Sequence, residues 1–130
     1  MIELSAREIA EAVQGTLVGL EEGAEDSVRC TSATTDSREV VEGTLFIAKP
    51  GETTDGHRFI GTAREAGSPL ALAERQIRDD EGRVLPSVIV PEVVEAMGRL
   101  AHEIVRRLKS EGEVTVLGIT GSAGKTTTKD

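Results

Sequence analysis

Aromatic residues are almost absent from this sequence of 130 residues, and their scarcity argues against one class of function. Phe46 and Phe59 are the only aromatic residues, because the sequence contains no Trp and no Tyr. Proteins that bind single-stranded nucleic acid stack the bases on several aromatic rings, and two rings provide little for such a surface. The formal net charge of −8 also repels phosphate backbones at long range. We therefore expect no nucleic-acid partner, and any anionic ligand must be held by a local site.

Cysteine, histidine and long apolar runs are scarce as well. With Cys30 as the only cysteine, an internal disulfide is impossible, and a reducing, cytoplasmic setting is the default. His57 and His102 do not form a zinc cluster with it at ligand spacing. The N-terminal segment carries acids where a signal peptide needs basic residues, and no run approaches about 18 consecutive apolar residues. The sequence therefore predicts a cytoplasmic protein without membrane insertion, and we expect a monomer.

Helix-like and strand-like segments alternate along the chain, which predicts an α/β fold. Ser5 and Glu8 form a capping-box pattern ahead of a short helix, with Ile9, Ala12 and Val13 on its inner face. Strands are expected over 28–35, 44–48, 70–73 and 87–90, and the first two are expected to pair as a hairpin. Helices are expected over 58–66 and from Pro91 to about Lys109. The inner face of the last helix is expected to hold Val93, Val94, Met97, Leu100, Ala101, Ile104, Val105 and Leu108.

A glycine-rich motif follows the apolar segment Val114–Ile119, which is typical of a strand buried in a parallel sheet. The motif predicts a phosphate-binding loop, because small residues let consecutive backbone N–H groups point at phosphate oxygens. Lys125 would reach the β- and γ-phosphates of ATP, and the Thr126 hydroxyl would bind Mg²⁺. The predicted ATP-binding residues are Gly121, Ser122, Ala123, Gly124, Lys125, Thr126 and Thr127.

The spacing of this motif departs from the commonest phosphate loop. Five residues separate Gly118 from Gly124, where that loop has four residues between its glycines. The alternative interpretation is a glycine turn between a strand and a helix, with an exposed lysine. Glu111-Gly112-Glu113 is the best candidate for a boundary between a first domain, 1–112, and a second, 113–130.

Two further segments are candidates for binding an anion. Thr35, Asp36, Ser37 and Arg38 gather hydroxyls and a guanidinium at the end of an expected strand, and the alternative is an Asp-Ser turn with a solvated arginine. The loop 51–57 contains an Asp-Gly turn dipeptide. Its His57 is either a ligand contact or a residue that caps the next helix.

Taken together, four segments resemble the N-terminal portion of the Mur ligase family, over nearly the whole chain. Within that family, the chain is most similar to the members that add D-alanyl-D-alanine, and the short spacing of the glycine motif is usual there. The diaminopimelate- or lysine-adding members share the Asp-Ser-Arg and Asp-Gly features. The segments are 35–38, 43–48, 55–60 and 119–129.

The resemblance implies a small mixed-sheet N-terminal domain, followed by the first strand and phosphate loop of a parallel-sheet ATPase domain. It implies an ATP- and Mg²⁺-dependent amide ligase of peptidoglycan synthesis, which phosphorylates a carboxylate of a UDP-N-acetylmuramoyl-peptide for attack by the amine of D-alanyl-D-alanine. Lys125 would be the catalytic residue of this chain. The residues expected around the UDP end of the substrate are Thr35, Asp36, Ser37, Arg38, Thr53, Asp55, Gly56 and His57.

The 130 residues alone are expected to be inactive. A helix that begins near Thr126 has only about one turn before Asp130, which is too short to be stable by itself. A different class of function also stays open, that of a nucleotide-binding module that performs no ligation.

Overall fold

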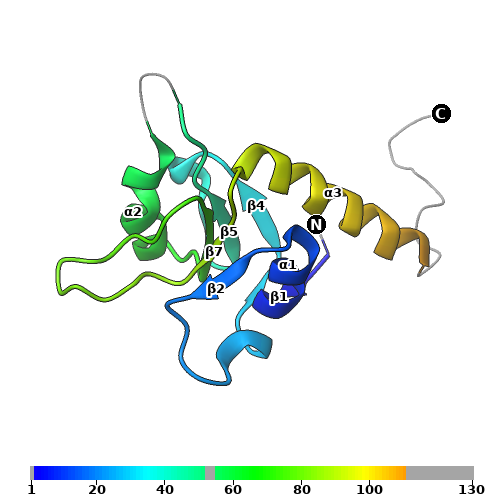
Figure 1. Ribbon diagram of the computed structural model, residues 1–130, viewed down its shortest axis with the longest axis horizontal. Helices are drawn as coiled ribbons and strands as arrows, with labels where there is room; N and C mark the ends of the chain where they lie inside the picture. Colours follow the sequence, from blue (N-terminus) through cyan, green and yellow to red (C-terminus); the bar gives the residue numbers. More distant parts are fainter. Residues whose placement is uncertain (1, 52–54, 111–130) are drawn as a thin grey trace. The chain divides into compact units, whose positions relative to one another are not determined.

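The computed structural model describes residues 2–51 and 55–110 (Figure 1). The chain divides into two units, 1–100 and 101–130, and the second is described only as far as Ser110. The predicted strand 114–119, the phosphate loop and the predicted boundary at 112/113 therefore lie outside the described residues.

A five-stranded mixed sheet forms the centre of the first unit. Its strand order is β2-β7-β6-β5-β4, in which the last four are parallel and β2 runs antiparallel to β7 (Figure 1). The predicted mixed-sheet α/β architecture is thereby confirmed for this unit. The strands are β2 (Thr16–Val18), β4 (Ser32–Thr34), β5 (Thr44–Ile47), β6 (Leu70–Ala73) and β7 (Ser87–Ile89).

The segment 28–35 was expected to be one strand in a hairpin, and this prediction is wrong. Strand β3 (Arg29–Cys30) pairs with β1 (Leu4–Ser5) in a separate two-stranded antiparallel sheet, and β4 joins the main sheet. Strands β4 and β5 are parallel, because the chain turns at a short 3-10 helix, η2 (Ser37–Glu39), and returns to the other end of the sheet before β5 begins.

The helices begin and end at recognisable local signals. Helix α1 (Ala6–Val13) starts with the predicted capping box, in which the backbone N–H of Ser5 and that of Glu8 each donate to the other residue's side chain, at 2.8 and 3.1 Å. A short 3-10 helix, η3 (Gly56–Phe59), precedes α2 (Ile60–Glu65), where one helix over 58–66 was expected. Helix α3 spans Val93–Ser110.

The main sheet is buried on both faces. Alternation along β5 and β6 places Phe46, Ala71 and Ala73 on the face that packs against Ile60 and Ala63 of α2. In Figure 1, α2 lies on one side of the sheet, whereas α1 and the first turns of α3 lie on the other. The second face carries the buried residues Leu45, Ile47, Leu70, Leu72 and Val88.

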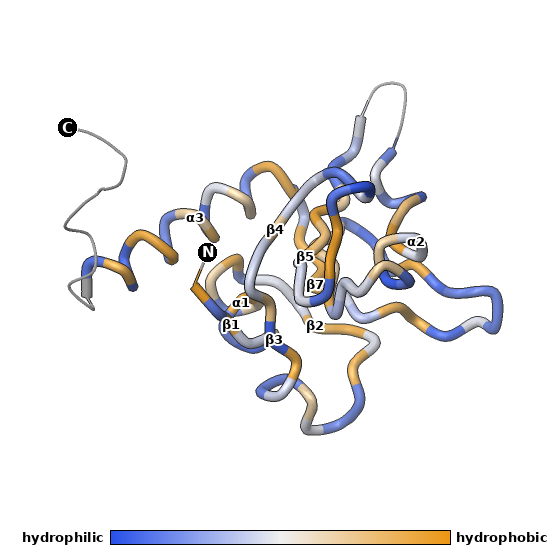
Figure 2. Tube along the Cα trace, turned by 180° about the vertical axis from the view of Figure 1, so that it is seen from behind, coloured by the Kyte–Doolittle hydropathy of each residue, from blue (hydrophilic) through white to orange (hydrophobic). Residues whose placement is uncertain are grey.

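Helix α3 is amphipathic, but its buried side differs from the prediction. Along its length the tube alternates between hydrophobic and hydrophilic colours (Figure 2). The buried residues of its first turns are Val93, Ala96 and Leu100, a spacing of three and four. Val94 and Val105 were expected to face inward but are 59% and 47% exposed, because the predicted face was wider than the one that packs. Within residues 2–51 and 55–110, no helix combines the length and the apolarity needed to cross a membrane.

Candidate functional site

Four connections leave the sheet at the edge where its parallel strands end. The segment 35–38 follows β4, the loop 48–56 follows β5, Glu74 follows β6, and Val90 follows β7. Ligands of open α/β sheets bind in the crevice outside the carboxyl ends of the strands, between the connections that start there. This carboxyl edge is therefore the first place to search for a site.

A groove of about 700 Å³ lies at this edge and joins two of the segments singled out in the sequence. It brings Gly56 together with the four residues 35–38, whereas Asp55 and His57 stand beside it without lining it. Thr53 lies outside the described residues. The groove is lined by Thr35, Asp36, Ser37, Arg38, Lys49, Pro50, Gly51, Gly56 and Phe59.

Four of the lining residues were not named as site residues by the sequence analysis: Lys49, Pro50, Gly51 and Phe59. Lys49, Pro50 and Gly51 could have been found from their position shortly after the buried strand β5, where ligand-binding loops of α/β folds begin. Phe59 was expected to be buried, and it does pack partly against the core while also bordering the groove.

The segment 35–38 holds a guanidinium at the mouth of the groove. The Asp36 carboxylate caps η2 by accepting from the backbone N–H of Arg38 at 2.9 Å. It also accepts from Arg38 Nε at 3.0 Å and from Arg38 Nη2 at 2.9 Å. These bonds with Arg38 hold the pKa of Asp36 below its usual value. The Arg38 side chain is 88% exposed, so it is oriented by the fold and still accessible to an anion.

The loop after β5 is closed at its base by a contact that only glycine permits. The backbone N–H of Gly56 donates to the carbonyl oxygen of Lys49 at 3.0 Å. A Cβ at Gly56 would lie 2.8 Å from both the N and the O of Lys49, closer than real Cβ atoms approach. The two ends of the loop therefore touch, and the segment Lys49–Gly51 is directed along the groove wall.

Asp55 collects three donors behind this loop. It accepts from the backbone N–H of His57 at 3.0 Å, from Nη2 of Arg75 at 2.8 Å and from Nδ1 of His57 at 2.6 Å. These interactions, led by the backbone bond, hold the pKa of Asp55 well below its usual range. The carboxylate is thereby fixed as an anchor for the loop.

His57 is a buried part of the fold. Its residue is 1% exposed, and its Nε2 accepts from the backbone N–H of Glu74 at 2.8 Å. Both ring nitrogens are thus engaged, and neither is left for a ligand. The sequence analysis left open whether His57 contacts a ligand or is a loop residue that caps the next helix. The structure favours a loop residue, whose ring also bonds to Glu74 at the end of β6.

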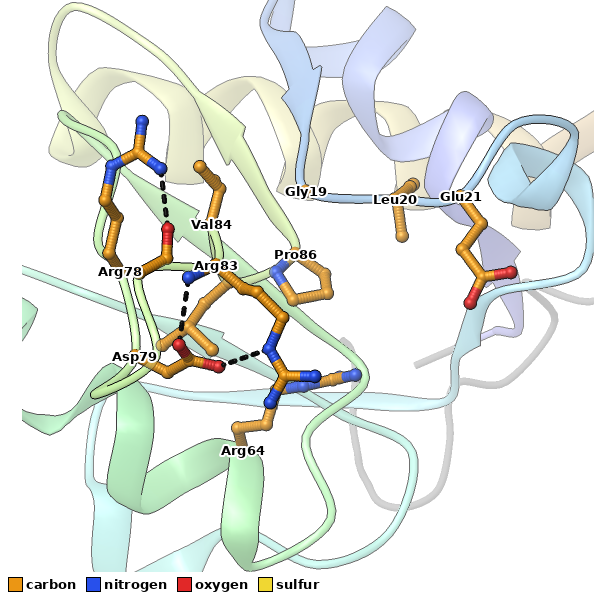
Figure 3. A pocket seen from close by; sticks show the side chains of 11 residues that line it. Gly19, Leu20, Glu21, Arg64, Arg78, Asp79, Arg83, Val84 and Pro86 are labelled. Carbon is orange, nitrogen blue, oxygen red and sulfur yellow. Dashed lines mark hydrogen bonds and ion pairs between the residues drawn. The ribbon is translucent and has the colours of Figure 1, made fainter.

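A second cavity, of about 530 Å³, lies at the opposite edge of the sheet (Figure 3). It is bordered by Gly19, which follows β2, and by Leu85 and Pro86, which precede β7. Its walls include Arg64, Arg78 and Arg83. None of the residues that the sequence analysis assigned to a site lines it.

The remaining candidates in the described residues are structural. Cys30 is buried, and burial raises the pKa of its thiol to about 12, which makes it an inert core residue. His102 is exposed. Residues 2–51 and 55–110 contain no group of three His, Cys, Asp or Glu side chains that would hold a metal ion. Thr126, the predicted Mg²⁺ ligand, lies outside this part of the chain.

Similarity to known proteins agrees with the sequence motifs. The profile described as "Mur ligase family, catalytic domain" matches residues 29–111. The UDP-N-acetylmuramoyl-tripeptide--D-alanyl-D-alanine ligase of Mycobacterium tuberculosis is 35% identical over 147 residues, covering 100% of this chain and 28% of that protein. The Bacillus subtilis ligase of the same name is 36% identical over 131 residues, covering 100% and 27%. The chain therefore spans little more than a quarter of the length of these relatives.

A relative with a different printed name also matches. The UDP-N-acetylmuramoyl-L-alanyl-D-glutamate--2,6-diaminopimelate ligase of Aquifex aeolicus is 39% identical over 100 residues, which cover 77% of this chain and 20% of that protein.

Solved structures show the same fold. MurF from Acinetobacter baumannii superposes with a TM-score of 0.67 at 23% identity, over 82% of this chain and 22% of that one. MurF from Thermotoga maritima, solved in complex with ADP, gives a TM-score of 0.51 at 30% identity, over 58% and 17%. The matched profile covers more than half of the chain, and the two D-alanyl-D-alanine ligases match along all of it. This chain belongs to the Mur ligase family.

Proposed function

We propose that this chain is the part of a D-alanyl-D-alanine-adding Mur ligase that binds the UDP end of its UDP-N-acetylmuramoyl-tripeptide substrate. The observation that carries the proposal is the groove at the carboxyl edge, where residues 35–38 and the base of the loop after β5 form one surface. Relatives that match all of this chain carry the corresponding ligase name, which supplies the substrate.

The chemistry of the groove suits a nucleoside diphosphate. Arg38 and Lys49 border it, and the one carboxylate in its wall, Asp36, already binds Arg38. A diphosphate therefore meets two cations in a protein whose net charge is −8. Pro50 and Phe59 supply an apolar surface on which the uracil ring can lie.

The chemical step of the proposal rests on residues outside the described part of the chain. We propose that residues 121–127 bind the phosphates of ATP, with Lys125 at the transferred phosphate and Thr126 at Mg²⁺. ATP would supply the phosphoryl group that activates the substrate carboxylate, and the amine of D-alanyl-D-alanine would then attack the acyl phosphate. The role of residues 1–110 is to hold the UDP end of the substrate. On this proposal the 130 residues alone do not ligate.

One observation favours a second candidate, the diaminopimelate-adding ligase. The Aquifex aeolicus relative with that function in its name is 39% identical over 77% of this chain. The groove does not distinguish the two candidate ligases, because the printed names of both kinds of relative begin with a UDP-N-acetylmuramoyl group and the groove is proposed to bind UDP. Ligation assays on the protein expressed from its full coding sequence separate them: D-alanyl-D-alanine with the tripeptide substrate, against diaminopimelate with the dipeptide substrate.

Calorimetry on the 130-residue chain tests the binding role. We expect saturable binding of UDP-N-acetylmuramoyl-tripeptide, competition by UDP, and little affinity for ATP. Tight ATP binding without UDP binding would instead support a nucleotide-binding module that performs no ligation. No UDP binding at all would contradict the proposal.

A further inference from the structure

A cleft of about 420 Å³ lies between α2 and the turn 77–85, on a part of the surface that the proposed function does not use. It shares Arg64, Arg78 and Arg83 with the amino-edge cavity, so the two hollows are neighbours. In Figure 3, Arg64 on α2 and Arg83 on the turn extend toward each other. None of the residues that line this cleft lines the groove at the carboxyl edge. The cleft is therefore a separate surface.

We propose that this arginine cleft is a docking surface for an acidic segment of another protein, whose carboxylates pair with the arginines and whose apolar side chain lies against Gly61 and Ile77. The inference concerns a different surface from the UDP groove and holds whether or not that groove binds UDP. The residues that carry it are Arg58, Gly61, Arg64, Ile77, Arg78 and Leu85.

Three arginines of the cleft have no carboxylate partner among the described residues. Arg64 reaches the carbonyl oxygens of Ser68 and Pro69, both at 3.5 Å. Arg78 donates to a carbonyl at 2.7 Å, and Arg58 lies over a phenylalanine ring with 5.9 Å between Cζ and the ring centroid. Every other arginine of the chain pairs with a carboxylate.

This clustering is unexpected in a protein with a net charge of −8, in which acids outnumber bases. The arginines that lack an internal carboxylate all line one cleft, where an external carboxylate can supply the missing partner. Arginine binds carboxylates through two parallel N–H···O bonds, so it is well suited to recognise them. The charge of the cleft therefore favours an acidic partner.

The acidic residues of the lining do not cancel these charges. Asp79 accepts from the backbone N–H groups of Glu81 and Arg83, both at 2.9 Å, and it pairs with Arg83 Nε at 3.1 Å. Glu65 and Asp80 also border the cleft, but neither forms an ion pair within the described residues. The three arginines without a partner remain in excess over these two carboxylates.

The positions of the arginines favour a peptide segment over one small anion. Arg58 and Arg64 are six positions apart along η3 and α2, which separates their backbones by about 10 Å along the helix axis. Arg78 lies on the opposite wall, in the turn. A segment with several carboxylates can pair with both walls.

Gly61 is an independent observation that points to a partner. It lies inside α2 and in the wall of the cleft, although glycine disfavours a helix interior because of its backbone entropy. Its φ is not positive, and a Cβ there would meet nothing within 4 Å among the described residues. Neither backbone conformation nor internal packing thus requires glycine at this position. The missing side chain leaves room for a partner to approach the helix backbone.

Two apolar residues of the lining are held in place by the core. Leu85 belongs to the buried cluster around Phe46, and Ile77 packs partly against it. The backbone N–H of Leu85 donates to the carbonyl of Ile77 at 2.8 Å, which closes the base of the turn. An apolar side chain of the partner would cover the accessible part of Ile77 and remove it from water. We therefore assign one apolar residue to the acidic segment.

An NMR titration of the 130-residue chain at low ionic strength tests the proposal with a synthetic peptide, acetyl-Glu-Glu-Leu-Glu-Glu-amide. We expect saturable amide shifts in residues 58–65 and 77–85, while residues 35–38 stay constant. The neutral peptide acetyl-Gln-Gln-Leu-Gln-Gln-amide should bind at least about tenfold more weakly, since the charge-assisted bonds are lost. No saturable binding of the acidic peptide, or equal binding of the neutral one, overturns the inference.

Substitutions of opposite sign show whether the cleft itself attracts the peptide. Arg64→Gln and Arg78→Gln should each weaken binding several-fold, whereas Asp80→Asn should strengthen it. Arg7→Gln is the matched control, because Arg7 is exposed and pairs with Asp26 elsewhere on the surface. An equal loss in Arg7→Gln would show general attraction between opposite charges and would overturn the docking site.

Gly61→Leu fills the proposed contact point with a residue that favours helices. We expect about a tenfold loss of peptide affinity without a loss of stability in denaturant unfolding, because the new side chain projects into the open cleft. Unchanged affinity overturns the placement of the partner at Gly61.

Two further outcomes would assign the cleft to another occupant and overturn the proposal. One is binding of pyrophosphate to the same residues with the affinity of the peptide, which would indicate a site for a small anion. The other is self-association of the chain in sedimentation experiments, abolished by Gly61→Leu, which would indicate a second copy.

Discussion

The groove at the carboxyl edge of the sheet and the cavity at its amino edge both contain arginines that bind within their own turns, but they lie at opposite edges of the sheet. In the cavity, Arg83 binds Asp79 through Nε at 3.1 Å and also pairs with Glu81. Arg78 donates to the carbonyl of Gly82 at 2.7 Å (Figure 3). These bonds stay within one turn, 78–83, and they hold that turn in shape.

In the groove, Arg38 binds one carboxylate, that of Asp36 in its own turn, whereas Arg83 of the cavity pairs with two. The walls of the groove come from two connections that start at the neighbouring ends of the parallel strands β4 and β5. On the proposed function, the ligand site is marked by its position at the carboxyl ends of the parallel strands and not by the number of arginines. The following predictions test this difference.

The largest effect is expected from Gly56→Ala. The new Cβ would lie 2.8 Å from backbone atoms of Lys49, so the base of the loop must open. We expect a loss of about 1–3 kcal/mol in the free energy of unfolding, together with loss of UDP binding. Denaturant unfolding and calorimetry measure the two.

Gly61→Ala is the matched control for this substitution, since a Cβ at Gly61, inside α2, meets nothing within 4 Å. It should stabilise the protein by up to about 1 kcal/mol through helix propensity. If both variants behave alike, the contact at Gly56 does not define the groove.

The second effect compares Arg38→Gln with Arg83→Gln. We expect Arg38→Gln to weaken binding of UDP-N-acetylmuramoyl-tripeptide at least about tenfold, because a charge-assisted bond to the diphosphate is lost. Its stability should change little, since the side chain is exposed. Arg83→Gln removes one charge of the same sign from the amino edge and should leave the affinity unchanged. A larger loss in Arg83→Gln would place the anion site in the cavity.

The third effect concerns two glutamates. Glu74→Ala removes the acceptor of the Val93 N–H at the start of α3 and should cost about 1 kcal/mol in the free energy of unfolding. Glu81→Ala removes only an exposed partner of Arg83 and should cost less than about 0.5 kcal/mol. Thermal unfolding of both variants checks the difference, and equal values would show that Glu74 contributes no cap.

The smallest effect is a change in acid titration. The pKa values of Asp55 and Asp79 both lie below the usual value, Asp55 mainly through the backbone N–H of His57 and then Arg75, and Asp79 mainly through the backbone N–H of Arg83. The stabilisation from each carboxylate is therefore complete above its unfolded-state pKa and is lost as the pH falls toward the depressed folded-state pKa. Carbon NMR should show Arg75→Gln raising the pKa of Asp55 alone. A rise in both would indicate a general change in the fold.

Local patterns predicted the elements whose stability is local. The capping box could be predicted because the two residues that form it, Ser5 and Glu8, lie three positions apart. Strands β5 and β6 could be predicted because each is a continuous run of buried, mostly apolar residues. Strand β2 was missed, since it has only three residues and is partly exposed at an edge. The parallel pairing of β4 and β5 depends on contacts across the sheet, which no local pattern encodes.

The candidate site was predictable in the same partial way. The segment around Asp36 and Arg38 was interpreted either as an anion-binding turn or as a turn with a solvated arginine, and the structure brings it together with Gly56 in one groove. The hydrogen bond between His57 and Glu74 joins residues 17 positions apart, so sequence spacing gave no sign of it. Lys49 and Phe59 became visible as groove residues only when the ends of β4 and β5 were placed side by side.

The most direct test of the central claim is an NMR titration of the 130-residue chain with UDP-N-acetylmuramoyl-tripeptide. The account predicts that the amide shifts of residues 35–38, 49, 51 and 56–59 change with one common affinity, while those of residues 19–21 and 78–85 stay constant. Shifts confined to residues 19–21 and 78–85, or no saturable shift at the carboxyl edge, would contradict it.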